Sequence, residues 1–388
     1  MSAPSSVAVT GLGVLSPGGR GTDALWRACA GGKVAFRPVE HFDVSRTGAH
    51  LAGFVPEEAT GPEAPPPGHP ARLPYLVHRS TGEALDDAES RTGPGRFRAG
   101  RTALVLGTTD SGGFPSAAAW RAWHEGRSPV AGAGWTPYAP PSWDGPVVQV
   151  GNASAAGATA LGVGADLLRD GVADRVLVCG VDTVTETAFH GLASLRTLSP
   201  GGCRPFAARR SGIRISECAA TVVLERAADR PLVHLRGWGS SNEASQPARP
   251  DFEGVAKAVR RALADARTRP EDIGYVNAHA AGTRHGDVAE LRALEEVLGG
   301  HLPRIPVVSS KAALGHCQGA AGTVEAIVTV LTLLRGEVLP TLGLQDRDSR
   351  WDHLNLGDKR PDRPPQAALT LSCGLGGSNV AVVFGHGA

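Results

Sequence analysis

The sequence predicts an α/β fold with mostly parallel, buried sheets. Short β-branched runs alternate with segments of helical periodicity along the 388 residues, which is the pattern of successive βαβ units. The runs are apolar throughout, as strands covered by helices on both faces must be. Two such series follow one another along the chain, and their order indicates an internal duplication.

The first series opens with a glycine-containing run, Val7–Leu15, which predicts a buried strand followed by a tight loop. A short helix is expected over Asp23–Cys29. The following segment is rich in proline, glycine and charge, carries one helical patch at Tyr75–Glu89, and is expected to cap the core. Thr102–Leu106 is the next strand. The stretch Phe114–Gly145 places tryptophans among prolines and glycines, which indicates an irregular, packed excursion such as a subunit contact or pocket wall.

The centre of the first series is a predicted strand-to-helix turn within Val147–Gly171. Val147–Val150 is a β-branched run, and a cluster of Gly, Asn, Ser and Ala separates it from a segment with helical periodicity. Ser154 would therefore sit where a helix N-terminus directs its unpaired N–H groups outward, a common place for a nucleophile. The alternative is that Asn152 or Ser154 merely caps the helix.

Further strands and helices are expected in a regular order after this turn. In chain order they are strands at Arg175–Cys179, Ala219–Leu224 and Val233–Gly239, a helix at Phe252–Ala266, a strand at Tyr275–Ala280, a helix at Asp287–Leu298, a strand at Val307–Ser310, a helix at Ala320–Leu334, and strands at Ala368–Ser372 and Asn379–Phe384. We divide the chain into an N-terminal half, residues 1–230, and a C-terminal half, residues 231–388.

Three polar residues follow predicted strands of the second half: His279, Lys311 and His316. A single histidine at a strand end is usually a structural hydrogen-bonding group, and a single lysine is usually solvated. Open α/β sheets nevertheless bind ligands beyond the carboxyl ends of their strands. Together with Ser154, the three residues therefore form a candidate catalytic set.

Bulk properties exclude several classes of function. The 39 basic and 38 acidic residues nearly balance, which argues against a nucleic-acid partner. The six cysteines show no CxxC spacing, so we expect reduced thiols and no metal site. The N-terminus lacks the features of a signal peptide, and the Ala320–Leu334 helix is too short to span a bilayer. We therefore expect a cytoplasmic protein without a membrane anchor.

Several motifs resemble, in this order and spacing, the signatures of the β-ketoacyl synthases, the condensing enzymes of fatty acid and polyketide synthesis. The motifs are NASAAG at 152–157, NAHAAGT at 277–283, SSKAALGHCQGAAG at 309–322 and SCGLGGSN at 372–379. The resemblance covers nearly the whole chain. It implies the thiolase fold, with two halves in a duplicated, five-layered α-β-α-β-α core, and a dimer whose interface includes the nucleophile strand.

The chain departs from the family pattern at functional positions. Ser154 replaces the cysteine that is acylated in the family, and the HGTGT motif reads HAAGT from His279. The PFDxxRDG motif has lost both acids, although Phe206 is kept. The gating loop FGFGG reads CGLGG from Cys373 and has no phenylalanine.

The exchange of sulfur for oxygen changes what the turn can do. A helix N-terminus stabilises an anion by roughly 0.3–2 kcal/mol, which helps a thiol of pKa about 8.5 but is far too little for an alcohol. Ser154 would thus need a general base, for which His279 and His316 are the candidates. Neither Cys317 nor Cys373 aligns with the nucleophile turn, and we expect both to be structural.

The resemblance also implies an oxyanion hole and a substrate contact set. The oxyanion hole would use the backbone N–H groups of Ser154 and Leu375, provided that the gating-loop glycines keep the loop shape. Those glycines are Gly374, Gly376 and Gly377. Substrate contacts are expected from Thr283, Asn379 and Phe206.

Three functions remain open. The favoured one is a non-condensing partner of an active ketosynthase, similar to the chain length factors of type II polyketide synthases. The second is a serine-dependent acyltransferase or hydrolase that uses Ser154 with His279 or His316. The third is a malonyl-thioester decarboxylase. Condensation through an acyl-enzyme is disfavoured, because the acylated thiol is absent.

The expected partners follow from the same resemblance. Substrates would arrive on the phosphopantetheine arm of an acyl carrier protein, and no other cofactor is expected. The second subunit would be a ketosynthase with an intact cysteine, or otherwise a second copy of this chain.

Overall fold

The structure is a computed structural model that describes residues 6–92, 101–109, 126, 143, 145–243, 250–361 and 363–387. The expected excursion at 114–145 lies almost entirely outside the described residues. In the described part, ten strands form one continuous sheet in the order β11-β10-β12-β13-β9-β1-β8-β7-β5-β6, and a short strand, β2 (Gly19–Arg20), pairs with β1.

The sheet consists of two halves that meet at β1 and β9. The first half holds β1 (Val7–Ser16), β5 (Thr102–Gly107), β6 (Val147–Val150), β7 (Arg175–Asp182) and β8 (Cys218–Glu225). The second half holds β9 (Val233–Asn242), β10 (Tyr275–Asn277), β11 (Val307–Val308), β12 (Ala367–Gly374) and β13 (Ser378–Gly385). The predicted strands are all present, although the strands expected at Tyr275–Ala280 and Val307–Ser310 are limited to β10 and β11.

Both halves have the same topology. Read from the outer edge to the junction, the first half runs β6-β5-β7-β8-β1 and the second runs β11-β10-β12-β13-β9. If the strands of each half are numbered in chain order, both sequences read third, second, fourth, fifth, first. The directions also agree, because the outer three strands of each half are parallel and the remaining pairs are antiparallel. The structure thus confirms the internal duplication.

The prediction of a mostly parallel sheet was wrong. The sheet is mixed, because β7 and β12 are each followed by an antiparallel strand. In the second half that connection is a short turn between Gly374 and Ser378, and antiparallel neighbours need no crossover helix. The buried, β-branched character of the strands alone did not distinguish the two directions.

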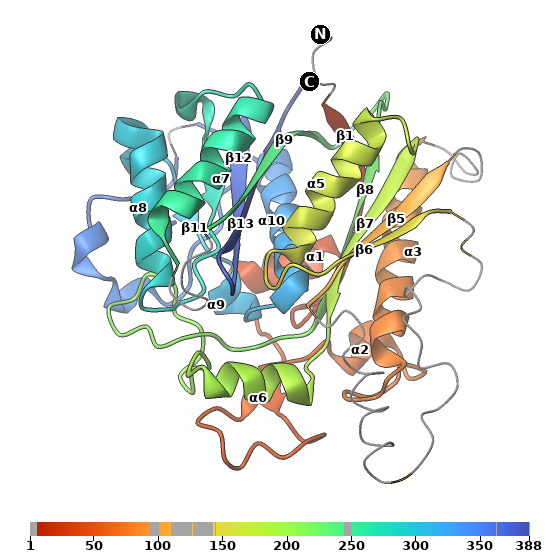
Figure 1. Cartoon of the computed structure of the whole chain (residues 1–388), viewed down its shortest axis with the longest axis vertical. Coiled ribbons are helices and arrows are strands. Elements are labelled where there is room, and N and C mark those ends of the chain that lie inside the picture. Colours follow the sequence, from red (N-terminus) through yellow and green to blue (C-terminus); the bar gives the residue numbers. More distant parts are fainter. Residues whose placement is uncertain are drawn as a thin grey trace.

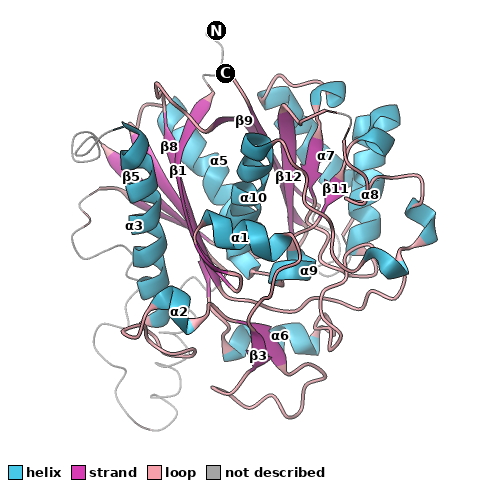
Figure 2. Cartoon of the chain, turned by 180° about the vertical axis from the view of Figure 1, so that it is seen from behind, coloured by secondary structure: helices cyan, strands magenta, loops and turns pink. Residues whose placement is uncertain are grey.

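Helices and half-sheets alternate as five layers (Figure 1). Helices α5 (Ala156–Arg169) and α10 (Ala321–Arg335) lie between the two half-sheets. Helix α3 (Arg72–Thr92) covers the outer face of the first half-sheet. Helices α7 (Phe252–Asp265) and α8 (Gly286–Leu298) cover the outer side of the second half, and Figure 2 shows the same arrangement from behind.

Smaller elements surround these layers. They are the helices α1 (Thr22–Cys29), α2 (Glu57–Thr60), α6 (Glu186–Ser194) and α9 (Lys311–Leu314), the ribbon of β3 (Phe36–Pro38) and β4 (Leu51–Gly53), and 3₁₀ turns at 270–272, 299–304, 318–320, 344–346 and 349–351. The predicted helices at Asp23–Cys29, Phe252–Ala266 and Asp287–Leu298 agree with the structure to within one residue at each end.

Helix α3 belongs to the core and not to a cap. It packs on β1, β7 and β8, and its apolar residues form one cluster with those strands. Strand β1 runs through its glycines to Ser16 and is followed by a tight turn to β2, as predicted. A Cβ atom at Gly11 or Gly13 would lie 2.3 Å or 2.2 Å from a carbonyl oxygen of α3, so these glycines allow the helix to approach the strand closely.

The two central helices also meet through small residues. A Cβ atom on Gly157 of α5 would lie 2.5 Å from Thr323 Oγ1, and one on Gly322 of α10 would lie 2.4 Å from the Ala158 nitrogen. This contact brings the N-terminus of α5, and with it the Ser154 turn, against the start of α10.

Candidate active site

Ser154 lies on the predicted turn between β6 and α5. The preceding residue, Ala153, has a φ of 45°, a left-handed conformation that costs an alanine about 1–2 kcal/mol. The first turn of α5 has no side-chain cap, and the Asn152 amide donates to Thr159 Oγ1 at 2.9 Å. The alternative that Ser154 caps the helix is therefore wrong. Among the described residues, Ser154 Oγ makes no hydrogen bond, and the side chain lines a cavity of about 560 Å³.

His279 lines the same cavity from the loop after β10. The carboxylate of Glu290, on α8, accepts hydrogen bonds from the backbone nitrogens of His279 at 2.6 Å and Ala280 at 2.7 Å. Burial raises the pKa of Glu290 to about 8, against these two bonds, which lower it. Glu290 thus fixes the HAAGT loop, and it was not identified from the sequence.

His316 faces the cavity from the loop between α9 and α10, and its tautomer is determined by a hydrogen bond. The backbone N–H of Gln318 donates to His316 Nδ1 at 2.9 Å. A neutral imidazole that accepts at Nδ1 carries its proton at Nε2. His316 therefore presents a hydrogen-bond donor, and not a base, at Nε2.

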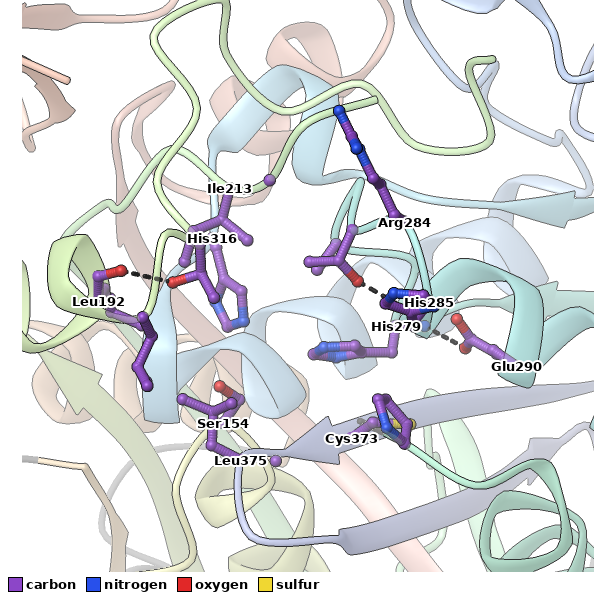
Figure 3. Close-up of a pocket in the computed structure, with 18 of the residues that line it drawn as sticks. Ser154, Leu192, Ile213, His279, Arg284, His285, Glu290, His316, Cys373 and Leu375 are labelled. Atoms are coloured by element: carbon purple, nitrogen blue, oxygen red, sulfur yellow. Dashed lines mark hydrogen bonds between the residues drawn. The ribbon is translucent and has the colours of Figure 1, made fainter. Parts of the chain in front are cut away.

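The two imidazoles lie together over Ser154. Their ring centroids are 5.4 Å apart at an interplanar angle of 76°, and Figure 3 shows both rings and the serine around one space. Burial, and after it the positive charge of Lys311, lowers the pKa of His316 to about 3 and that of His279 well below its usual value. Both rings are thus neutral at physiological pH. Within the described residues, no hydrogen bond joins Ser154 Oγ to either ring.

Lys311 lies behind the histidines and does not line the cavity. Its ammonium group forms a buried ion pair with Glu325 of α10. Burial raises the pKa of Glu325 to about 7, and the ammonium opposes the rise. Lys311 therefore acts on the site through its charge. Glu325 was not assigned a role from the sequence, although a single carboxylate in an otherwise apolar helix indicates a buried partner.

The gating loop closes the cavity beside Ser154. A Cβ atom on Gly374 would lie 3.2 Å from Ala153 Cβ, and Gly376 and Gly377 have φ angles of 91° and 84°. The glycines thus permit the loop shape, as expected. Ser154 and Leu375 both line the cavity, and their backbone N–H groups have no partner among the described residues, so both remain available to an oxyanion.

The three predicted substrate contacts differ in placement. Thr283 lines the cavity and is half-buried. Asn379 also lines it, but its amide donates to Glu243 Oε1 at 2.7 Å and to the Gly377 carbonyl at 3.2 Å. Phe206 does not line the cavity, because its ring is fully buried in a core cluster between the second half-sheet and its outer helices. Thr283 also has partners of its own, because its Oγ1 accepts a hydrogen bond from Gly286 N at 3.2 Å.

The two cysteines considered from the sequence also differ. Cys317 is buried in the core, whereas Cys373 is half-buried and lines the cavity. Burial, together with the carboxylates of Glu290 and Glu243, raises the pKa of Cys373 well above that of a free thiol. A protonated thiol is a weak nucleophile, so Cys373 does not present a reactive thiolate to the cavity.

Two further observations concern the described residues alone. No group of three or more His, Cys, Asp or Glu side chains among them is arranged to hold a metal ion. No helix among them combines the length and apolar character that crossing a membrane requires.

Known proteins match most of this chain. The model of the β-ketoacyl synthase N-terminal domain matches residues 76–230, and that of the C-terminal domain matches residues 232–345. A putative polyketide β-ketoacyl synthase 1 from Streptomyces halstedii is 30% identical, and the match covers 97% of both chains.

Solved structures agree with this assignment. The ishigamide ketosynthase/chain length factor has a TM-score of 0.82 and is 28% identical over the full length of both chains. A type II polyketide synthase ketosynthase in complex with its acyl carrier protein has a TM-score of 0.85 at 23% identity over 99% of this chain and 100% of that one, which shows the fold. The neighbours have the thiolase fold. This chain therefore belongs to the β-ketoacyl synthase family.

Proposed function

We propose that this chain is a non-condensing ketosynthase-like subunit of a type II polyketide or fatty acid synthase, and that its site decarboxylates malonyl groups carried on an acyl carrier protein. The proposal joins two of the functions left open by the sequence, the partner subunit and the decarboxylase. The observation that supports it is the orientation of His316, whose Nε2–H is a donor aimed into the cavity.

The two histidines are better placed to stabilise an enolate than to form an acyl-enzyme. When the bond between the malonyl α-carbon and its carboxylate breaks, carbon dioxide leaves and the electron pair moves into the thioester carbonyl. The resulting enolate oxygen would accept hydrogen bonds from His316 Nε2–H and from His279. A proton from water on the α-carbon then completes the acetyl thioester. Donors placed where charge develops are the largest single contribution to many enzymatic rates.

Acyl transfer through Ser154 has less support. An alcohol needs a base within about 2.6–3.2 Å, and His316 holds its proton on the nitrogen that faces the cavity. His279 is the remaining candidate base, and no hydrogen bond links it to Ser154 among the described residues. The neutral serine leaves space in the site without offering a thiolate.

A carrier protein would dock beside a second, basic cavity. Arg46, His190 and Arg196 line a hollow of about 520 Å³, and Arg196 also lines the catalytic cavity. Acyl carrier proteins present phosphate and carboxylate groups, which arginine binds well. We expect Arg46→Glu to raise KM for the malonyl carrier and to leave kcat nearly unchanged.

The proposed partner is a ketosynthase with an intact cysteine. A subunit that cannot be acylated gains a function in condensation only when a second subunit holds the growing chain. The likeness to the ishigamide ketosynthase/chain length factor supports this assembly. Co-expression with such a ketosynthase should yield a heterodimer, and recovery of this chain only as a homodimer would contradict the pairing.

The decisive experiment is incubation with a malonyl carrier protein labelled at its free carboxylate. We expect release of labelled carbon dioxide, formation of the acetyl carrier, and no mass increment on the peptide that contains Ser154. His316→Ala should lower the rate about 100- to 1,000-fold, as loss of one oxyanion donor does, whereas Ser154→Ala should leave it within a few-fold. A mass increment on that peptide that disappears in Ser154→Ala would instead identify a serine acyltransferase.

A further inference from the structure

The loop that carries His316 belongs to the second half in sequence, but the first half holds it. His316 N donates to the Arg214 carbonyl at 2.6 Å, and Ser216 N donates to the His316 carbonyl at 2.9 Å. These two bonds join His316 to Ile215 as an isolated parallel bridge just before β8. The bridge fixes the backbone of the loop at one residue, His316 itself.

A side-chain hydroxyl adds a further attachment before the imidazole. Ser216 Oγ donates to the Leu314 carbonyl at 2.7 Å, and Ser216 is fully buried. Among the described residues, no other hydrogen bond reaches that carbonyl. Because Leu314 is the last residue of α9, the hydroxyl joins the end of this short helix to the first half.

Gly315 lies between this attachment and the bridge, and it is the residue at which the loop can rotate. Its φ is 75°, and glycine has the widest range of backbone conformations. Its N–H donates to the Lys311 carbonyl at 2.9 Å, which ties it to α9 but not to the first half. A Cβ atom on Gly315 would lie 2.1 Å from Ser216 Oγ, so the hydroxyl lies directly against this residue. The hydroxyl therefore restrains the step at which α9 joins His316.

We propose that Ser216 is a positioning residue for His316. Its hydroxyl holds α9 and Gly315 on the first half, which also carries Ser154, and so fixes where the imidazole stands in the cavity. Alanine at this position would leave the Leu314 carbonyl without its partner, and Gly315 would then let the imidazole shift. A misplacement of about 1 Å can cost about 100-fold in rate. The effect on rate rests on the proposed decarboxylation, whereas the effect on the loop does not.

The test combines amide hydrogen exchange with kinetics on the full chain. Ser216→Ala removes one buried oxygen atom and leaves the backbone bridge in place. We expect the amides of Gly315 and His316 to exchange at least about tenfold faster than in the wild type, because the loop opens more readily. For malonyl-carrier decarboxylation, kcat should fall at least about tenfold with KM little changed, because the walls of the cavity are unaltered. Ser216→Gly also lacks the hydroxyl and should give the same two results if Ser216→Ala does not fold.

Ser80→Ala is the matched control. Ser80 is also fully buried, and its hydroxyl lies 2.9 Å from Thr221 Oγ1 within the first half, away from the cavity. Its loss should leave kcat and the exchange of both amides unchanged, and equal changes in Ser80→Ala would overturn the proposal. Wild-type exchange at both amides in Ser216→Ala, or a wild-type kcat in that variant, would also overturn it. Faster exchange in Ser216→Ala, when the wild-type chain does not decarboxylate the malonyl carrier, would overturn only the proposed function.

Discussion

The two halves of the sheet share one topology, but the polar groups that follow their strands make different contacts. At the end of β7 in the first half, Asp182 accepts hydrogen bonds from Thr108 Oγ1 at 2.7 Å, Thr109 N at 3.0 Å and Gly319 N at 2.5 Å. The second half instead directs His279 and His316 into the cavity and buries an ion pair behind them. The shared topology places polar residues at the same edge of the sheet in both halves. The type of side chain determines whether these residues bond to one another or face the cavity.

The largest expected change in the free energy of unfolding comes from removing a buried charge, and it can be compared between the two halves. Glu325→Gln leaves the Lys311 ammonium buried without a countercharge, which should lower the free energy of unfolding by about 3–5 kcal/mol. Asp182→Asn keeps an acceptor oxygen and should cost about 1–3 kcal/mol. Urea unfolding at pH 7 measures both. Equal losses would show that the second half is no more dependent on its buried charge than the first.

A second test addresses the contact between the halves. Gly322→Ala places a methyl group 2.4 Å from the Ala158 nitrogen of α5, and we expect a loss of up to about 3 kcal/mol in unfolding free energy. The matched control is Gly82→Ala in α3, where no atom lies within 4 Å of the added Cβ. That exchange should stabilise the protein by about 0.5–1 kcal/mol.

If Gly322→Ala were as stable as Gly82→Ala, the two central helices would not be in the close contact described above, and the halves would be less tightly joined. Thermal unfolding of both variants under one buffer condition is sufficient to compare them.

The smallest of the three effects depends on pH. His316 has a pKa of about 3 in the folded chain and about 6.5 when unfolded, so below pH 6.5 the unfolded chain takes up a proton that the folded chain does not. The contribution of His316 to stability is thus present above pH 6.5 and falls by about 2 kcal/mol between pH 7 and pH 5. His316→Gln should lose correspondingly less stability on acidification. A wild-type acid dependence in His316→Gln would contradict the low pKa.

Local signals account for what the sequence predicted well. The helix at Phe252–Asp265 begins where Asp251 accepts a hydrogen bond from Glu253 N, and such caps are visible as residue types. The alternation of runs and helical segments likewise predicted the strands and the duplication. Strand direction depends on pairing between distant segments, and for that reason the mixed sheet was missed.

The sequence predicted only the part of the candidate site that depends on local motifs. Ser154, His279 and His316 were placed together because motif order and strand ends bring them to one edge. Glu290 and Glu325 were missed because each acts through a contact with a residue on another element. Phe206 lies outside the cavity because its ring is buried in a core cluster formed by distant segments of the chain, and the sequence does not reveal that packing.

The hydrogen bonds between the first half and the His316 loop have a consequence for cutting the chain into two fragments. A chain cut between Arg230 and Pro231 would yield one fragment with the serine and another with both imidazoles, and the second fragment would have lost the carbonyl and carboxylate that orient its own loop. Neither fragment would contain the whole cavity. Mixing them should restore the proposed decarboxylation only as fast as the fragments reassociate, so the rate at which activity recovers would measure the rate of their association.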